Sequence, residues 1–210
     1  MGGEIIRFIY VIAMRDATLR GAYKGERTEL TDINKFKKIK TEFSDFLGKI
    51  VSGEFESRED YNKEFLELAH TVTDEINGYA GNSEFTFGNA QKLINMAVKY
   101  LYICSIGDEE KKECFKYCHC PMDSIMLKQV WNSRGNLSEK VQSDLGRAAD
   151  FTKSWGNEDF EKKGFPERYL KFQEAVRELA EDEDCNPLEY DYRHWQAEKD
   201  ADGQNRSSKK

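Results

Sequence analysis

The spacing of large apolar residues limits most strongly what this chain can fold into. In two long stretches, residues 33–50 and 61–76, they recur every three or four positions, the period of one buried face of an α-helix. The first stretch contains Ile33, Phe36, Ile39, Phe43, Phe46, Leu47 and Ile50, and the second Tyr61, Phe65, Leu68, Val72 and Ile76. No segment beside a hairpin turn keeps the two-residue alternation of a strand. We therefore predict an all-α fold, one globular domain of about eight or nine helices over residues 1–199.

Capping residues predict where these helices begin and end. Ser57 has the form of an N-cap with Asp60 as its reciprocal partner, and Asn77-Gly78 should end the helix that follows. The most apolar helix is expected over residues 89–106. Four later helices are expected to begin at Asp123, Ser138, Pro166 and Asn186-Pro187.

Neither end of the chain indicates a membrane protein. The seven apolar residues from Phe8 to Met14 are too few to span a bilayer, and we interpret them as part of a buried helix, with a signal peptide as the lesser alternative. Five cysteines, an odd number without a clear export signal, favour reduced thiols and a cytoplasmic protein. Residues 200–210 contain no large apolar side chain and are predicted to be a disordered tail.

Charge is distributed unevenly along the chain. With 32 Lys and Arg against 39 Asp and Glu, the net charge of −7 disfavours a protein that binds nucleic acid through overall basicity. Residues 51–80 hold eight acidic and two basic side chains, a segment that could bind a protein partner. A basic cluster precedes it, either a contact for a polyanion or a solvated helix face: Arg20, Lys24, Arg27, Lys35, Lys37, Lys38 and Lys40.

Lys92 and Asp123 are the residues most suited to chemistry. Lys92 is predicted in the opening turn of an otherwise apolar helix, where the helix dipole and partial burial both favour the neutral, nucleophilic amine. Asp123, at the start of a later helix, is favoured as a carboxylate by backbone N–H groups. An amine and a carboxylate brought together could form an imine and stabilise a positive transition state.

Residues 85–125 resemble the helix-hairpin-helix DNA glycosylases, most closely the archaeal-type 8-oxoguanine DNA glycosylases. In that family a lysine opens the second helix of the hairpin and a Pro-x-Asp opens a later helix; here Gln91-Lys92 and Pro121-Met122-Asp123 are similar. The resemblance implies an all-helical fold with Lys92 as the Schiff-base nucleophile and Asp123 as its activator. Lys99, two turns along nearly the same helix face, is the alternative nucleophile.

The function implied by this resemblance is a DNA glycosylase and AP lyase that removes an oxidised or modified base from double-stranded DNA. No cofactor is expected. The implied substrate-binding residues are Phe85, Phe87, Gln91, Lys99 and Trp131, with Gly88 against the DNA backbone. The aromatic rings among them would hold the extruded base; the alternative is that they are core residues.

Two further functions stay open. Cys114, Cys118, His119 and Cys120, with Cys104 nearby, offer soft ligands for zinc, although their spacing gives at most one irregular half of a typical site. Buried thiols are the alternative interpretation. The chain could also be a helical interaction module without enzymatic activity that binds a protein through the acidic segment 51–80.

Overall fold

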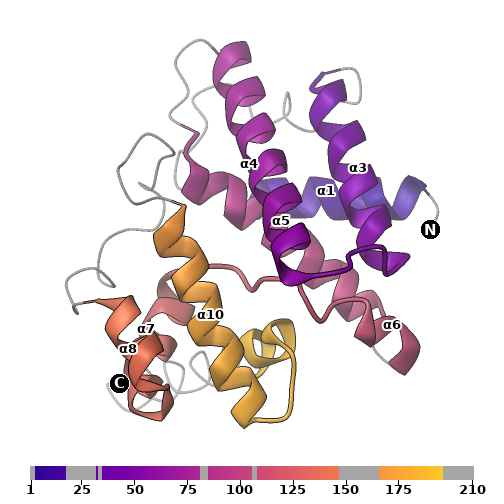
Figure 1. Ribbon diagram of the computed structural model, residues 1–210. Helices are drawn as coiled ribbons and strands as arrows, with labels where there is room; N and C mark the ends of the chain where they lie inside the picture. Colours follow the sequence, from indigo (N-terminus) through magenta and orange to yellow (C-terminus); the bar gives the residue numbers. More distant parts are fainter. Residues whose placement is uncertain are drawn as a thin grey trace, which may run out of the picture. The chain divides into compact units, whose positions relative to one another are not determined.

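A computed structural model describes residues 3–17, 32, 35–80, 85–105, 108–146 and 166–195. Every regular element within these ranges is a helix, which confirms the all-α prediction (Figure 1). The chain divides into two compact units. Of the described residues, the first unit contains those up to Cys118 together with Pro166, and the second contains residues 119–146 and 167–195. The predicted tail, residues 200–210, lies outside the described residues.

The first unit is built around one central helix. Its helices are α1 (Gly3–Ala17), α3 (Lys37–Val51), α4 (Arg58–Ala80), α5 (Phe87–Cys104) and α6 (Glu109–Glu113). The central helix α5 packs against α1 and α4, and α3 packs against both α4 and α1 (Figure 1). The predicted stripes of α3 and α4 face this core, since Ile39, Phe43, Tyr61 and Phe65 are almost fully buried.

Helix α1 confirms that the apolar run near the N-terminus is helical. Ile9, Tyr10, Ala13 and Met14 are buried, whereas the Phe8 side chain is 64% exposed. The run therefore buries one face of the helix rather than its whole circumference. None of the described helices is both long and apolar enough to cross a bilayer.

Helix α5 begins two residues earlier than predicted because of a capping box. The Thr86 hydroxyl accepts a hydrogen bond from the Asn89 N–H (3.2 Å), and the Asn89 side-chain oxygen accepts one from the Thr86 N–H (3.1 Å). This reciprocal pair satisfies two backbone donors at the helix start. Phe87 and Gly88 thereby join the helix.

Helix α4 shows one correct and one incorrect boundary. The Ser57 hydroxyl accepts a hydrogen bond from the Asp60 N–H (3.1 Å), as the capping pattern predicted. The expected stop at Asn77-Gly78 is wrong, because the helix continues to Ala80. Asn77 instead joins α4 to the segment before α5: its amide donates to the Phe85 carbonyl (2.9 Å) and accepts from the Phe85 N–H (3.0 Å).

The second unit contains helices whose starts agree with prediction. They are α7 (Ser124–Ser133), the 3-10 turn η1 (Arg134–Asn136), α8 (Glu139–Leu145), α10 (Glu167–Asp182) and a helical segment over residues 187–195. The side chains of Asp123, Ser138 and Asn186 accept hydrogen bonds from the backbone N–H groups of the helices that follow them. Pro166 directly precedes α10, which packs against α7 and α8.

Candidate functional site

Lys92 lies on the central helix α5, two residues further from the helix start than predicted. Because the helix begins at Phe87, Lys92 is in its second turn, and the influence of the helix dipole falls off within the first turn. The dipole therefore contributes less to a neutral amine than the sequence suggested. The side chain is half-buried between two fully buried neighbours, Gln91 and Leu93, and Lys99, two turns on, is 8% exposed.

Asp123 is an N-cap residue, as predicted. Its Oδ1 accepts hydrogen bonds from the N–H groups of Ile125 and Met126, both at 3.0 Å, and the side chain is buried. Asp123 belongs to the second unit and Lys92 to the first. Each residue is thus placed within its own unit, and their convergence on one pocket stays a prediction.

The residues expected to contact DNA on α5 and just before it are buried in the first unit. Phe85 and Phe87 are almost completely inaccessible. The buried Gln91 amide donates to the Gly88 carbonyl (3.1 Å) and accepts from the Asn95 amide (3.0 Å), so both of its ends are engaged within α5. This burial favours the alternative that the rings are core residues, and their contact with a substrate stays a prediction.

Trp131 lies on α7 in the second unit and is half-buried. The guanidinium group of Arg134 lies 4.2 Å from the centre of its ring and donates a hydrogen bond to the Trp131 carbonyl (2.7 Å). A cation–π contact of this kind already covers one face of the indole. A base could stack on that face only after Arg134 moved away.

The cysteine and histidine residues do not form a metal centre in the described part of the chain. No three His, Cys, Asp or Glu side chains there lie close enough together to hold a metal ion. His119 is buried, with its Nδ1 3.0 Å from the Tyr169 hydroxyl, and Cys118 and Cys120 are also buried. Cys114 is half-buried and its thiol donates to the Glu110 carbonyl (3.8 Å). The zinc hypothesis gains no support from this geometry.

The basic cluster is in part engaged within the first unit. Lys38 forms an ion pair with Glu75 (3.9 Å), and Lys35 lies 5.0 Å from the centre of the Tyr79 ring. Lys40 donates to the carbonyl of Lys35 (2.8 Å), and burial lowers the pKa of its ammonium group. Arg20, Lys24 and Arg27 lie outside the described residues. These contacts favour a structural role over a surface for a polyanion.

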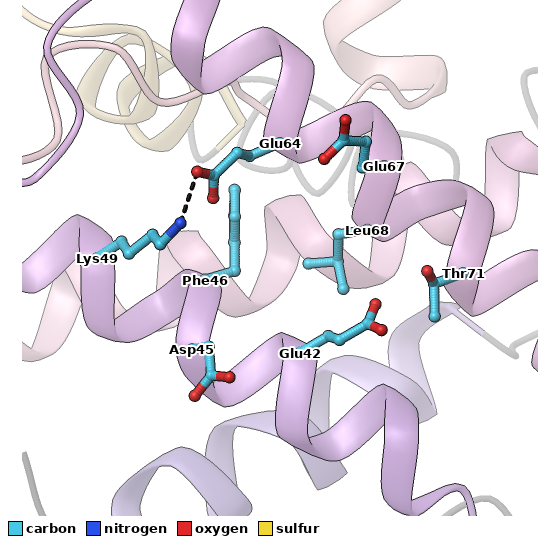
Figure 2. Close-up of a pocket in the computed structure, with 8 residues that line it drawn as sticks. All are labelled: Glu42, Asp45, Phe46, Lys49, Glu64, Glu67, Leu68 and Thr71. Carbon is cyan, nitrogen blue, oxygen red and sulfur yellow. Dashed lines mark hydrogen bonds and ion pairs between the residues drawn. The ribbon is translucent and has the colours of Figure 1, made fainter.

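An acidic groove lies between α3 and α4 in the first unit. Its volume is about 400 Å³, and Figure 2 shows its lining residues. Both helices contribute residues at the same spacing, i, i+3, i+4 and i+7, which places four side chains on one face of each helix. They are Glu42, Asp45, Phe46 and Lys49 from α3, and Glu64, Glu67, Leu68 and Thr71 from α4.

Carboxylates dominate the electrostatics of this groove. Lys49 Nζ lies 2.6 Å from Glu64 Oε1, and this hydrogen bond raises the pKa of the lysine, assisted by the charges of Glu64, Glu54 and Asp60. Within the described part of the chain, the side chains of Glu42, Asp45 and Glu67 form no hydrogen bond or ion pair. Four carboxylates thus share a single ammonium group, and the groove should attract cations.

The shape of the groove places the acids around an apolar base. Phe46 and Leu68 are buried and lie between the two rows of polar side chains. In Figure 2, Glu42 extends from α3 toward Thr71 of α4, whereas Asp45 points away from α4. A ligand in the groove would therefore meet apolar surface below and carboxylates at the sides.

The sequence analysis singled out one of the two helices that line this groove. The acidic excess of residues 51–80 indicated a partner surface on α4, but Glu42 and Asp45 lie in a segment that is basic overall. The sequence signal that could have revealed the groove is the i, i+3, i+4, i+7 spacing of its lining residues, which occurs in both helices. The chain matches no protein-family model, no curated protein and no solved structure.

Proposed function

We propose that this protein is a helical binding module that takes a cationic segment of a partner protein into the groove between α3 and α4. The observation that carries the proposal is the lining itself: four carboxylates and one lysine surround Phe46 and Leu68, and three of the carboxylates have no partner among the described residues. The cytoplasmic location suggested by the cysteine count belongs to the same proposal.

The free energies of ion pairing and of apolar burial indicate which kind of partner the groove suits. An exposed ion pair contributes roughly 0.2–1 kcal/mol, so three such pairs alone give weak binding. Burial of an apolar side chain against Phe46 and Leu68 would add about 25 cal/mol for each Å² removed from water. The groove therefore suits a peptide that combines Lys or Arg with one apolar residue, and its volume of about 400 Å³ accommodates a few side chains rather than a whole helix.

The test is a titration with a labelled peptide that carries four lysines around one leucine. Exchange of both Glu42 and Glu67 for Gln should weaken binding about tenfold, and higher salt should weaken binding to the unchanged protein. The matched control exchanges Glu59 and Glu113, exposed acids that do not line the groove, for Gln. Equal losses in both double variants would show that only net charge matters and would overturn the groove proposal, as would a lack of binding.

A DNA glycosylase and AP lyase remains a second proposal. Two observations favour it: Asp123 caps a helix directly after Pro121-Met122, and Lys92 is half-buried on a helix whose neighbouring residues are inaccessible. In this mechanism the Lys92 amine attacks C1′ of the damaged nucleotide as the base leaves with the bonding electron pair. The C1′–O4′ bond then breaks to give the imine, with O4′ taking up a proton, and loss of a C2′ proton permits elimination of the 3′ phosphate. Asp123 stabilises positive charge on the sugar, and water finally hydrolyses the imine to release Lys92.

Borohydride trapping tests this second proposal directly. A duplex with an abasic or 8-oxoguanine site should give a covalent adduct that Lys92→Ala abolishes and Lys99→Ala retains. Transfer of the requirement to Lys99 would identify it as the nucleophile instead. Neither adduct nor strand cleavage with the unchanged protein would remove the glycosylase from consideration and would leave the peptide-binding proposal untouched.

A further inference from the structure

Two ion pairs join α3 to α4, one toward each end of the acidic groove. Lys49 Nζ lies 2.6 Å from Glu64 Oε1, and Lys38 Nζ lies 3.9 Å from Glu75 Oε1. The first of these, the Lys49 pair, belongs to the lining drawn in Figure 2, whereas the second, the Lys38 pair, lies just beyond it. In each pair α3 supplies the lysine and α4 supplies the glutamate.

Helix geometry places the Lys38 pair in line with the groove. On α3, Lys38 precedes Glu42 by four residues. On α4, Glu75 follows Thr71 by four residues. Each residue of the pair therefore lies one turn beyond the groove, on the helix face that lines it. The two ion pairs are eleven residues apart on each helix, which corresponds to about 16 Å along the helix axis.

The carboxylates that can receive a ligand lie between these two ion pairs. The side chains of Glu42 and Glu67 form no hydrogen bond or ion pair within the described ranges. A cation opposite either of them gains a new partner, whereas a cation over the Lys38 pair or the Lys49 pair meets two charges that cancel. At physiological salt, screening reduces charge interactions beyond about 8 Å. Cations of a ligand that lie outside the two pairs therefore contribute little to binding.

The apolar base of the groove lies in the same interval. Phe46 and Leu68 are buried, and both fall between the Lys38 pair and the Lys49 pair along their helices. The apolar side chain of a ligand and its useful cations must then share this length. Since an extended chain advances about 3.3–3.6 Å per residue, an interval of about 16 Å holds roughly five residues.

We propose that the two ion pairs limit the length of the recognised segment, so that the groove selects partners whose cations lie within about five consecutive residues around one apolar side chain. This inference rests on the proposed peptide-binding function and adds a length limit to it. A partner of equal net charge with more widely spread cations would place some of them over the neutral ion pairs and would bind more weakly.

Two labelled peptides of identical composition test the length limit. The compact peptide is Pro-Pro-Lys-Lys-Leu-Lys-Lys-Pro-Pro, and the spread peptide is Lys-Lys-Pro-Pro-Leu-Pro-Pro-Lys-Lys. Proline keeps both peptides extended, and the inner lysines of the spread peptide are about 19 Å apart. We expect the unchanged protein to bind the compact peptide about tenfold more tightly, the effect of two or three exposed ion pairs.

Removal of both limiting lysines should weaken this preference. Exchange of Lys38 and Lys49 for Gln leaves Glu75 and Glu64 without these partners and lengthens the row of available carboxylates. The spread peptide should therefore gain more affinity than the compact peptide, and the tenfold preference should fall to about twofold. Titration of the same protein sample with each peptide measures the preference.

The matched control exchanges Lys37 and Lys63 for Gln, exposed lysines of the same two helices that do not line the groove. It removes the same charge but leaves both ion pairs in place, so the preference should persist. Equal binding of the two peptides by the unchanged protein would overturn the length limit and leave the groove proposal standing. The limit would also fail if the preference survived exchange of Lys38 and Lys49, or fell equally in the control. Binding of neither peptide would overturn the proposed function and the length limit together.

Discussion

The ammonium group of Lys49 and the carboxylate of Glu64 meet at 2.6 Å on the rim of the α3/α4 groove. This pair neutralises one of four lining carboxylates and leaves Glu42, Asp45 and Glu67 to attract a ligand. In the proposed binding module, Lys49 would therefore compete with a lysine or arginine of the partner for the carboxylates of the groove.

Removal of that competitor should strengthen binding. We expect Lys49→Met to increase the affinity for a basic peptide severalfold, because Glu64 becomes available and the groove loses its one positive charge. The free energy of unfolding should change by less than about 1 kcal/mol, as is typical of a partly exposed ion pair. Peptide titration and urea unfolding of the same sample measure both effects. Unchanged or weaker binding by Lys49→Met would contradict the proposed role of Glu64.

Asn77 should be among the most important polar residues of the first unit. Asn77→Ala removes both hydrogen bonds to the Phe85 backbone and leaves a buried N–H and C=O without these partners. We expect a loss of about 2–4 kcal/mol in the free energy of unfolding. Urea unfolding measures this loss, with Asn132→Ala, at an exposed position of α7, as the control. Similar effects of the two substitutions would show that the Asn77 bonds contribute little.

Asp123 offers a way to separate capping from catalysis. Asp123→Ala should lower the free energy of unfolding by about 1 kcal/mol through loss of the N-cap, whereas Asp123→Asn should preserve stability because asparagine caps equally well. If the glycosylase proposal is correct, Asp123→Asn should nevertheless lose strand cleavage, since the carboxylate charge is gone. Thermal unfolding and a cleavage assay on the same variants distinguish the two roles. A stable and fully active Asp123→Asn would limit this residue to capping.

Four of the five cysteines should react with a thiol reagent in a defined order. Cys104 is exposed and should react first. Burial raises the pKa of the Cys185 thiol to about 11, so little reactive thiolate is present at pH 8. Cys118 and Cys120 are buried and should react only after unfolding. Mass spectrometry after timed labelling would show this order, and early labelling of Cys118 would contradict the described packing.

The sequence predicted elements far better than it predicted the site. The stripes of α3 and α4 and the caps at Asp123, Ser138 and Asn186 were recognisable because they depend on neighbours within one turn. The role of Asn77 was not, because its partner, Phe85, lies eight residues away and their contact depends on how the chain turns between two helices. The groove could not be predicted for the same reason, because its acidic residues come from two helices that meet only after folding.

All eight residues that line the groove fall on two successive helices, between residues 42 and 71. The central helix α5, with its buried amides and rings, supplies none of them. For the proposed binding module, substitutions on α3 and α4 would therefore change which partner is recognised while the core residues of α5 stay the same, so that affinity and stability could be adjusted separately.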